Sequence, residues 1–372
     1  MMATAIGAVV RSLSEVLGWH ARRNGSPVRN LGREIYLLMD LSTTCDILCS
    51  HCFRNAYTPA PRTMTARELE VLETSVFPHV DRLAFSETAE ALHVRMMPEA
   101  LSAARRAGIP FIRIQSNGTH LSPEVGKVLL DHDLNVLGVS LDAVTPETFA
   151  RIRKGADWEQ VVKNVRAFAR MRDARPEART RIALNFSVMV QNAAEAPSFI
   201  RFAKELGADS VSFTHLMIET EEMRSWSLIH DPVRANSLFS ELREEAEQVA
   251  FPVLVPEDVP STLKPFDGAL LESPCYHGPC QAAREKWVYL MADGTCHPCL
   301  NLQDCRPMGN VFETPLSELW FGPRNQSFRR GALVSGHVEG CDHCKIFIDP
   351  SETGNEMAYM AKRLTTRSAA NL

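Results

Sequence analysis

Three cysteines lie close together near the start of the chain, in the segment TTCDILCSHCFRNA at residues 43–56. Three residues separate Cys45 from Cys49, and two separate Cys49 from Cys52. Cysteine thiolates bind iron–sulfur clusters, normally four to a [4Fe–4S] cube, so three cysteines in one loop leave one iron open for another ligand. A zinc ion is the alternative for this loop. A zinc ion needs a fourth ligand. The candidate is His51, which lies between Cys49 and Cys52 in the sequence and would be sterically strained as a ligand.

The other seven of the ten cysteines lie within 275–344, and none lies between 53 and 274. Two such groups indicate metal or redox chemistry and not scattered buried thiols. Cys296 and Cys299, like Cys341 and Cys344, are separated by two residues. Paired cysteines at this spacing are also typical of a zinc ribbon, which is the alternative for the second group.

Composition limits the function. The chain has 372 residues, 45% of them hydrophobic, and a net charge of −5 with both signs mixed. This balance predicts neither nucleic-acid nor anionic-membrane binding. No apolar run approaches the ~18–20 residues that span a bilayer. The N-terminal segment lacks a basic residue before its short apolar stretch, so we interpret it as an amphipathic docking helix and not a signal peptide. We therefore expect a cytoplasmic protein.

The elements that position the first cysteines are strands alternating with helices. Helix starts are marked at Thr65, which has Glu68 three residues later as in a capping box, and at Ser122, which precedes Pro123. The predicted strands cover residues 34–42, 82–86, 111–119, 135–143, 181–190 and 210–217. Strands separated by helices predict a parallel sheet with right-handed crossovers.

Six such units are too few for a closed eight-stranded barrel. They predict an α/β fold, a partial (β/α)6 barrel followed by a small C-terminal cysteine-rich iron–sulfur domain. Functional groups gather at the carboxyl ends of such strands, and the cysteine loop begins just past the end of the first. The predicted organisation is an N-terminal helical extension (1–32), the barrel (33–220), a helical connector (221–270), the cysteine-rich domain (271–348) and a tail (349–372).

The Cys-x3-Cys-x2-Cys loop after the first strand of a partial barrel resembles the radical S-adenosylmethionine (SAM) superfamily. The resemblance covers about 35–217. It includes IQSNGTHL at the third strand and VSLDAVTPETFARIRKGADWEQVVKNV after the fourth. It implies that Cys45, Cys49 and Cys52 hold a [4Fe–4S] cluster whose open iron is chelated by SAM. It also implies that an electron from the cluster cleaves SAM to a 5′-deoxyadenosyl radical, which removes hydrogen from a substrate.

The resemblance also assigns candidate SAM contacts. His51 stands where the family often has an aromatic residue whose backbone meets the adenine. The family's Gly-Gly-Glu-Pro-like loop, which binds the SAM amino group, is replaced by FSETAEALH, where Glu90 is the best match and Glu87 the second. Arg153 is a candidate for the SAM carboxylate. The candidates for the ribose or carboxylate are Ser116, Asn117, Ser140 and Asp142. Turn and cap roles are the alternative for each of these polar residues.

The C-terminal cysteines, with GNVFETPLSELW between them, resemble the SPASM/twitch domain that follows many radical SAM domains. The shorter twitch form, with one auxiliary iron–sulfur cluster, fits better because no cysteine follows Cys344. The implied ligands are Cys280, Cys299, Cys341 and Cys344. Cys275, Cys296 and Cys305 remain as alternative ligands, and Cys305 is also a candidate hydrogen donor to a substrate radical.

The resemblance implies an enzyme that needs a flavodoxin- or ferredoxin-type electron donor. We expect oxidation or epimerisation of a small molecule such as a sugar, cyclitol or nucleoside. The alternative is a peptide-modifying maturase, although the 32 residues before the first strand are too few for a peptide-recognition module of the usual size. A non-catalytic iron–sulfur or zinc redox sensor is the third possibility.

Overall fold

The computed structural model describes residues 31–55, 59–86, 88–218, 220–256, 258–259, 280–300, 307–334 and 338. The predicted N-terminal helix and the C-terminal tail therefore fall outside the described residues. Six parallel strands match the six predicted ones, with the second beginning two residues earlier than predicted: β1 (Ile35–Met39), β3 (Val80–Phe85), β4 (Phe111–Ser116), β5 (Val136–Ser140), β7 (Arg181–Val188) and β8 (Ser210–His215). They neighbour one another in this order, so the predicted α/β fold with a mostly parallel sheet is confirmed.

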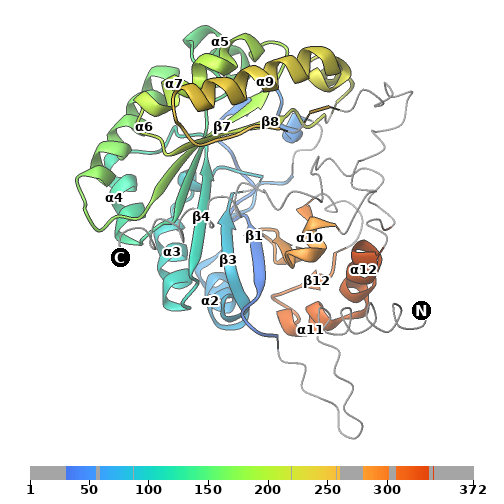
Figure 1. Ribbon diagram of the computed structural model, residues 1–372. Helices are drawn as coiled ribbons and strands as arrows, with labels where there is room; N and C mark the ends of the chain where they lie inside the picture. Colours follow the sequence, from blue (N-terminus) through green and yellow to red (C-terminus); the bar gives the residue numbers. More distant parts are fainter. Residues whose placement is uncertain are drawn as a thin grey trace, which may run out of the picture. The chain divides into compact units, whose positions relative to one another are not determined.

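Helices lie along one face of this sheet (Figure 1). They are α2 (Ala66–Ser75), α3 (Met97–Arg106), α4 (Pro123–Asp131), α5 (Pro146–Ile152), α6 (Trp158–Asp173) and α7 (Ala196–Glu205). The predicted helix starts are confirmed. Thr65 and Glu68 form a reciprocal capping box on α2, and the Ser122 side chain accepts a hydrogen bond from the Val125 amide at the start of α4.

The core lies between the sheet and these helices. The helix-facing strand positions are apolar and buried, for example Phe186 on β7 and Phe213 on β8. Phe199 of α7 packs against Phe186 with ring centroids 4.9 Å apart, and Phe213 lies 5.3 Å from Phe186. On the opposite face, alternate positions of β4 and β7 include the polar residues Gln115 and Asn185, whereas Tyr36, Leu38 and Ala84 of β1 and β3 belong to a buried apolar cluster. Helix packing thus covers one face of the sheet and leaves polar side chains on the other.

The sheet extends beyond the six predicted strands at both edges. The segment 221–270 was expected to be a helical connector, but it also contributes β9 (Val253–Leu254), which pairs parallel with β8 after the long helix α9 (Pro232–Gln248). A two-residue strand between Pro252 and Pro256 is too short to show a strand period in the sequence.

At the other edge, β10 (Trp287–Leu290) from the cysteine-rich segment pairs parallel with β1. The strands β11 (Thr295–His297) and β12 (Gly309–Asn310) follow in antiparallel order. The helices α10 (Gln281–Arg284), α11 (Leu316–Phe321) and α12 (Pro323–Val334) accompany them. Buried Arg329 of α12 donates from Nη1 to the Ala283 carbonyl at 2.8 Å, which joins α12 to α10. The cysteine-rich segment is thus an extension of the central sheet.

The remaining short elements are β2 (Leu48–Cys49), β6 (Arg153–Lys154), α8 (Glu221–Arg224) and the 3₁₀ helices η1 (Phe53–Asn55), η2 (Phe77–His79), η3 (Ala91–His93), η4 (Ala193–Glu195) and η5 (Leu228–His230). None of the helices in the described ranges has the length and apolar character needed to cross a membrane.

Candidate functional site

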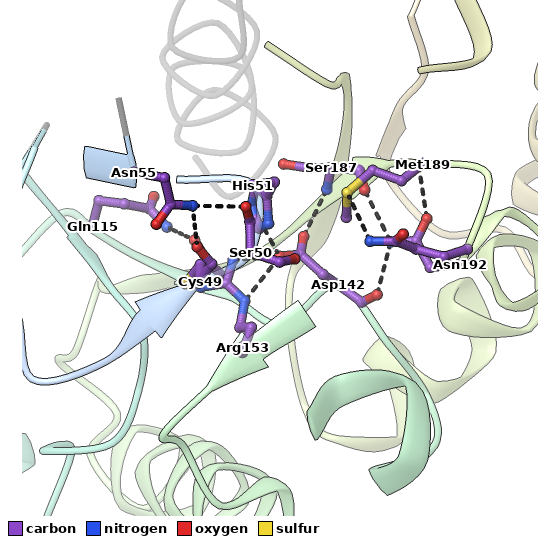
Figure 2. Close-up of polar contacts among 12 residues, drawn as sticks. Cys49, Ser50, His51, Asn55, Gln115, Asp142, Arg153, Ser187, Met189 and Asn192 are labelled. Carbon is purple, nitrogen blue, oxygen red and sulfur yellow. Dashed lines mark hydrogen bonds and ion pairs between the residues drawn. The ribbon is translucent and has the colours of Figure 1, made fainter. Parts of the chain in front are cut away.

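The cysteine loop follows β1 and is held in place by backbone contacts. Its strand β2 pairs antiparallel with β6, so that Cys49 lies opposite Arg153. The Ser50 amide donates to the Ile152 carbonyl at 2.7 Å. Figure 2 shows the Asn55 side chain, whose Nδ2 donates to the carbonyls of Cys49 (3.0 Å) and Ser50 (2.7 Å). These hydrogen bonds fix the loop without using the thiols, which are left for a ligand.

The three thiols lie close enough to influence one another electrostatically. Each is half-buried and free of disulfides. Burial raises the pKa of Cys45 and of Cys49 to about 11, and it also raises the pKa of Cys52. Each thiolate also raises the pKa of one neighbour. Cys49 raises that of Cys45, Cys52 raises that of Cys49, and Cys45 raises that of Cys52. The three therefore interact in a closed triangle, and a bound metal must displace their protons.

The chemistry of the donor set fits an iron–sulfur cluster, because all three groups are cysteine thiols outside any disulfide. Across the part of the chain that the structure describes, no three Cys, His, Asp or Glu side chains are placed to share one metal ion. The ligands of a [4Fe–4S] cluster bind different irons, so they need to face one space without converging on one point. A cavity of about 310 Å³ opens beside the triplet. Its lining residues are Cys45, Asp46, Ile47, Leu48, Arg54, Lys154 and Gly155.

Glu90, the predicted contact of the SAM amino group, is buried in the loop after β3. Its carboxylate accepts hydrogen bonds from the Leu92 amide (3.0 Å), the Ser116 hydroxyl (2.7 Å) and the Asn117 amide (2.7 Å). Burial raises the pKa of Glu90, while these three donors act in the opposite direction. The structure thus brings together three of the predicted residues, Glu90, Ser116 and Asn117. Glu87 lies outside the described residues.

Asp46, which sequence reasoning missed, connects this group to the cysteine loop. Its Oδ1 accepts from Asn117 Nδ2 at 2.8 Å, and its Oδ2 lies 3.1 Å from His120 Nε2. Because Asp46 follows Cys45 directly, its place inside the cysteine motif was the available signal. The Asn117–Asp46 contact links the β4 turn to the loop, so a ligand that touches both meets a preformed surface.

Glu90→Gln is expected to weaken SAM binding by about tenfold or more. The substitution removes the negative charge offered to the SAM ammonium group, and a hydrogen bond to a charged partner contributes ~1.5–3 kcal/mol. It also places an amide N–H₂ among three donors. SAM titration of reconstituted protein measures the effect, with Glu87→Gln as the matched variant. A larger loss in Glu87→Gln would assign the ammonium contact to Glu87.

Asp142 and Arg153 form a buried ion pair below the cysteine loop (Figure 2). Arg153 donates to Asp142 Oδ2 from Nε at 2.8 Å and from Nη2 at 2.5 Å, and its Nη1 lies 3.7 Å from the Cys49 sulfur. Asp142 Oδ1 accepts from the Ser187 amide at 2.7 Å. Arg153 therefore directs two nitrogens to Asp142 and one toward a predicted cluster ligand. Its contact with a SAM carboxylate stays a prediction.

His51 and Ser140 flank this pair. His51 Nε2 lies 3.7 Å from Asp142 Oδ2, and burial lowers the pKa of His51 while the carboxylate acts in the opposite direction. Ser140 accepts a hydrogen bond from Gln115 Nε2 at 2.7 Å, which places it on the polar face of the sheet. The SAM contacts predicted for both residues remain predictions.

The second cysteine group is described in part. Cys299 is buried among Ala282, Ala283, Phe328 and Ala332, and Cys280 packs against the same cluster of side chains. Cys296 on β11 is buried, and burial strongly raises its pKa. The predicted pair Cys280 and Cys299 is therefore brought together. The remaining cysteines of this group, Cys275, Cys305, Cys341 and Cys344, lie outside the described residues.

Comparisons with known proteins agree with this geometry. Residues 39–173 match the radical SAM superfamily, and residues 280–345 match the SPASM iron–sulfur cluster-binding domain. The chain is 28% identical over 204 residues to a GTP 3′,8-cyclase of Rhizobium etli, which covers 52% of this chain and 56% of the relative. It is 26% identical over 221 residues to a probable GTP 3′,8-cyclase of Methanocaldococcus jannaschii, which covers 59% and 70%. The match thus spans little more than half the length of the Rhizobium relative.

A solved structure shares the fold. Streptococcus suis SuiB bound to S-adenosylmethionine superimposes with a TM-score of 0.62 at 15% identity, over 80% of this chain and 68% of SuiB. The cysteine loop at the edge of the parallel sheet lies within the first matched domain, and Cys280, Cys299, Cys341 and Cys344 lie within the second. The chain therefore contains a radical SAM domain at residues 39–173 and a C-terminal SPASM domain at residues 280–345, with S-adenosylmethionine, a [4Fe–4S] cluster and an auxiliary iron–sulfur cluster as the cofactors.

Proposed function

We propose that this protein is a radical SAM enzyme that removes a hydrogen atom from a small organic substrate. The observation that carries the proposal is the grouping of three free thiols in a loop held by its backbone, next to the buried Glu90. When bound, the cluster and SAM supply an electron and a 5′-deoxyadenosyl radical, which is the reactive chemistry that a protein must position and protect.

The chain's own groups divide this work. Cys45, Cys49 and Cys52 hold the cluster, and the absence of a fourth cysteine in the loop leaves a site for SAM. Glu90 offers its carboxylate to the SAM ammonium group from a position fixed by Ser116 and Asn117. Arg153 places a cation beside Cys49. A fixed cation near a thiolate stabilises its charged form, which favours cluster binding.

The substrate class follows from two considerations. The relatives named GTP 3′,8-cyclase favour a nucleoside among the small molecules expected from the sequence, ahead of a sugar or cyclitol. The polar face of the sheet, with Gln115 and Asn185, also suits a hydrogen-bonding small molecule better than aliphatic peptide side chains. A peptide-modifying maturase is the alternative. Whether the reaction is an oxidation, an epimerisation or another rearrangement is a separate question.

The test is anaerobic reconstitution with iron and sulfide, followed by reduction and assay for 5′-deoxyadenosine. We expect 5′-deoxyadenosine to form with dithionite and with a flavodoxin- or ferredoxin-type donor. A reconstituted protein that contains iron and binds SAM without releasing 5′-deoxyadenosine would point instead to a non-catalytic redox sensor.

The hydrogen-donor role proposed for Cys305 gives a prediction of its own. A thiol S–H bond is weak, so an epimerase can use one to return hydrogen to the substrate radical. We expect Cys305→Ala to keep the full iron content of the wild type and to change the ratio of products. Loss of iron would make Cys305 a cluster ligand. Unchanged iron and products would remove it from the mechanism and favour oxidation.

A further inference from the structure

A polar layer crosses four strands of the sheet on the face away from the helices. Its members lie in two adjacent rows: Gln115 lies beside Gly138, and two residues further along the strands Ser140 lies beside Asn185 and Asn185 beside Ser212. The neighbouring strand positions that face the helices are apolar and buried, such as Leu184 beside Val211. The interior of a closed β/α barrel is normally filled by Val, Ile and Leu. Amides and hydroxyls in this position therefore require an explanation other than packing.

Gln115 is the centre of this layer. Its Oε1 accepts from Asn185 Nδ2 at 2.7 Å and from Arg113 Nη2 at 2.9 Å, and its Nε2 donates to Ser140 at 2.7 Å. Gly138 makes this arrangement possible, because a Cβ there would lie 2.3 Å from Gln115 Oε1. The side chains of β4, β5 and β7 are thus fixed with respect to one another.

Two atoms of the layer are buried without a hydrogen-bond partner among the described residues, Asn185 Oδ1 and Ser212 Oγ. A buried acceptor of this kind is normally satisfied by protein, water or a ligand. Asn185 Nδ2 donates to Gln115 Oε1, so Asn185 Oδ1 is left to accept a hydrogen bond from an N–H or O–H group outside the layer. Gln115 directly precedes Ser116, whose hydroxyl donates to Glu90, and Ser140 lies two residues before Asp142, so the layer leads into the strand ends that carry the candidate SAM contacts.

We propose that this layer binds the base of a nucleoside substrate. The proposal rests on the function proposed above and names the substrate class for the same site. A base with a lactam edge, such as guanine, offers an N–H donor to Asn185 Oδ1 and a carbonyl acceptor to a serine hydroxyl. Asparagine and glutamine amides read base edges in this way because their donor and acceptor lie side by side.

The experiment measures guanosine binding to reconstituted, SAM-loaded protein by anaerobic equilibrium dialysis. We expect saturable binding to the wild type and at least tenfold weaker binding to Asn185→Leu and Gln115→Leu. Asn185→Asp keeps the acceptor oxygen and is expected to bind more tightly than Asn185→Leu. Gln248→Leu makes the same amide-to-leucine change on the exposed outer side of α9 and is the matched control. Melting curves of each variant establish that it is folded.

Three results would overturn the proposal. These are no saturable guanosine binding to the wild type, equal binding to Gln115→Leu and Gln248→Leu, or displacement of guanosine by equimolar myo-inositol, which would indicate a site for polyols. The 5′-deoxyadenosine assay of the wild type is independent of guanosine. A protein that cleaves SAM but does not bind guanosine keeps the proposed function and loses this substrate class. A protein that binds guanosine but does not cleave SAM keeps the proposed binding site and loses the proposed function.

Discussion

Replacing Cys45, Cys49 or Cys52 singly with alanine is expected to abolish 5′-deoxyadenosine formation. Each thiol is the proposed ligand of a different iron, and a neighbouring thiol cannot substitute because hydrogen bonds from the Asn55 side chain and the Ser50 amide fix the loop. We expect each variant to lose the iron of this cluster and to keep that of the auxiliary cluster. Iron analysis, electron paramagnetic resonance of the reduced protein and the 5′-deoxyadenosine assay together measure the effect.

Thr74→Ala is a suitable control because it changes an exposed side chain on the outer helix α2. It should retain both clusters and full SAM cleavage. Undiminished 5′-deoxyadenosine formation in any of the three cysteine variants would contradict the assignment of that cysteine. Loss of the iron of both clusters would show that the triplet is also needed for folding, since the SPASM strand β10 pairs with β1 directly before the loop.

The sequence was sufficient for the features that depend on local patterns. Apolar runs alternating with amphipathic helices predicted the six central strands and their order. Thr65 with Glu68, and Ser122 with Pro123, predicted two helix starts, because a cap depends on residues within one turn. The cysteine loop was placed at the carboxyl end of β1 for a related reason. A motif directly after a parallel strand lies at the edge where the strands end.

Contacts between residues far apart in the sequence were beyond such reasoning. Glu90 was selected by family resemblance, but its three hydrogen-bond donors depend on how the β3 loop packs on the β4 turn. Arg153 was expected to meet the SAM carboxylate, whereas its Nε and Nη2 bind Asp142. Side-chain pairing of this kind depends on rotamers and burial, and the spacing of residues in the sequence predicts neither. The pairing of β10 with β1 is similarly non-local.

The polar layer was readable in principle. In β4, buried Ile112 and Ile114 alternate with half-buried Arg113 and Gln115, which is the period of a strand with one polar face. A sheet covered by helices on both faces shows apolar residues at nearly every strand position, so this alternation indicates an uncovered face.

Asp142→Ala is expected to lower the free energy of unfolding by ~3–5 kcal/mol, the cost of breaking a buried ion pair by removing one partner. Asp142 and Arg153 have side chains 1% and 8% exposed. The substitution leaves the guanidinium buried without its carboxylate and removes the acceptor of the Ser187 amide. Asp142 also has a φ of 58°, a backbone conformation that aspartate tolerates better than alanine. Thermal unfolding of the reconstituted protein should show a decrease in Tm on the order of 5 °C.

Asp173→Ala is the matched control. Asp173 pairs with Arg172 at 2.8 Å, but its side chain is 64% exposed, so solvent screens the pair and the expected loss is at most ~1 kcal/mol. The double variant Asp142→Ala with Arg153→Met removes both charges, so it should be more stable than Asp142→Ala alone. If Asp142→Ala and Asp173→Ala lower Tm equally, the Asp142–Arg153 pair does not anchor the cysteine loop. The cysteine loop would then be held mainly by the backbone pairing of β2 with β6, which the substitution leaves intact.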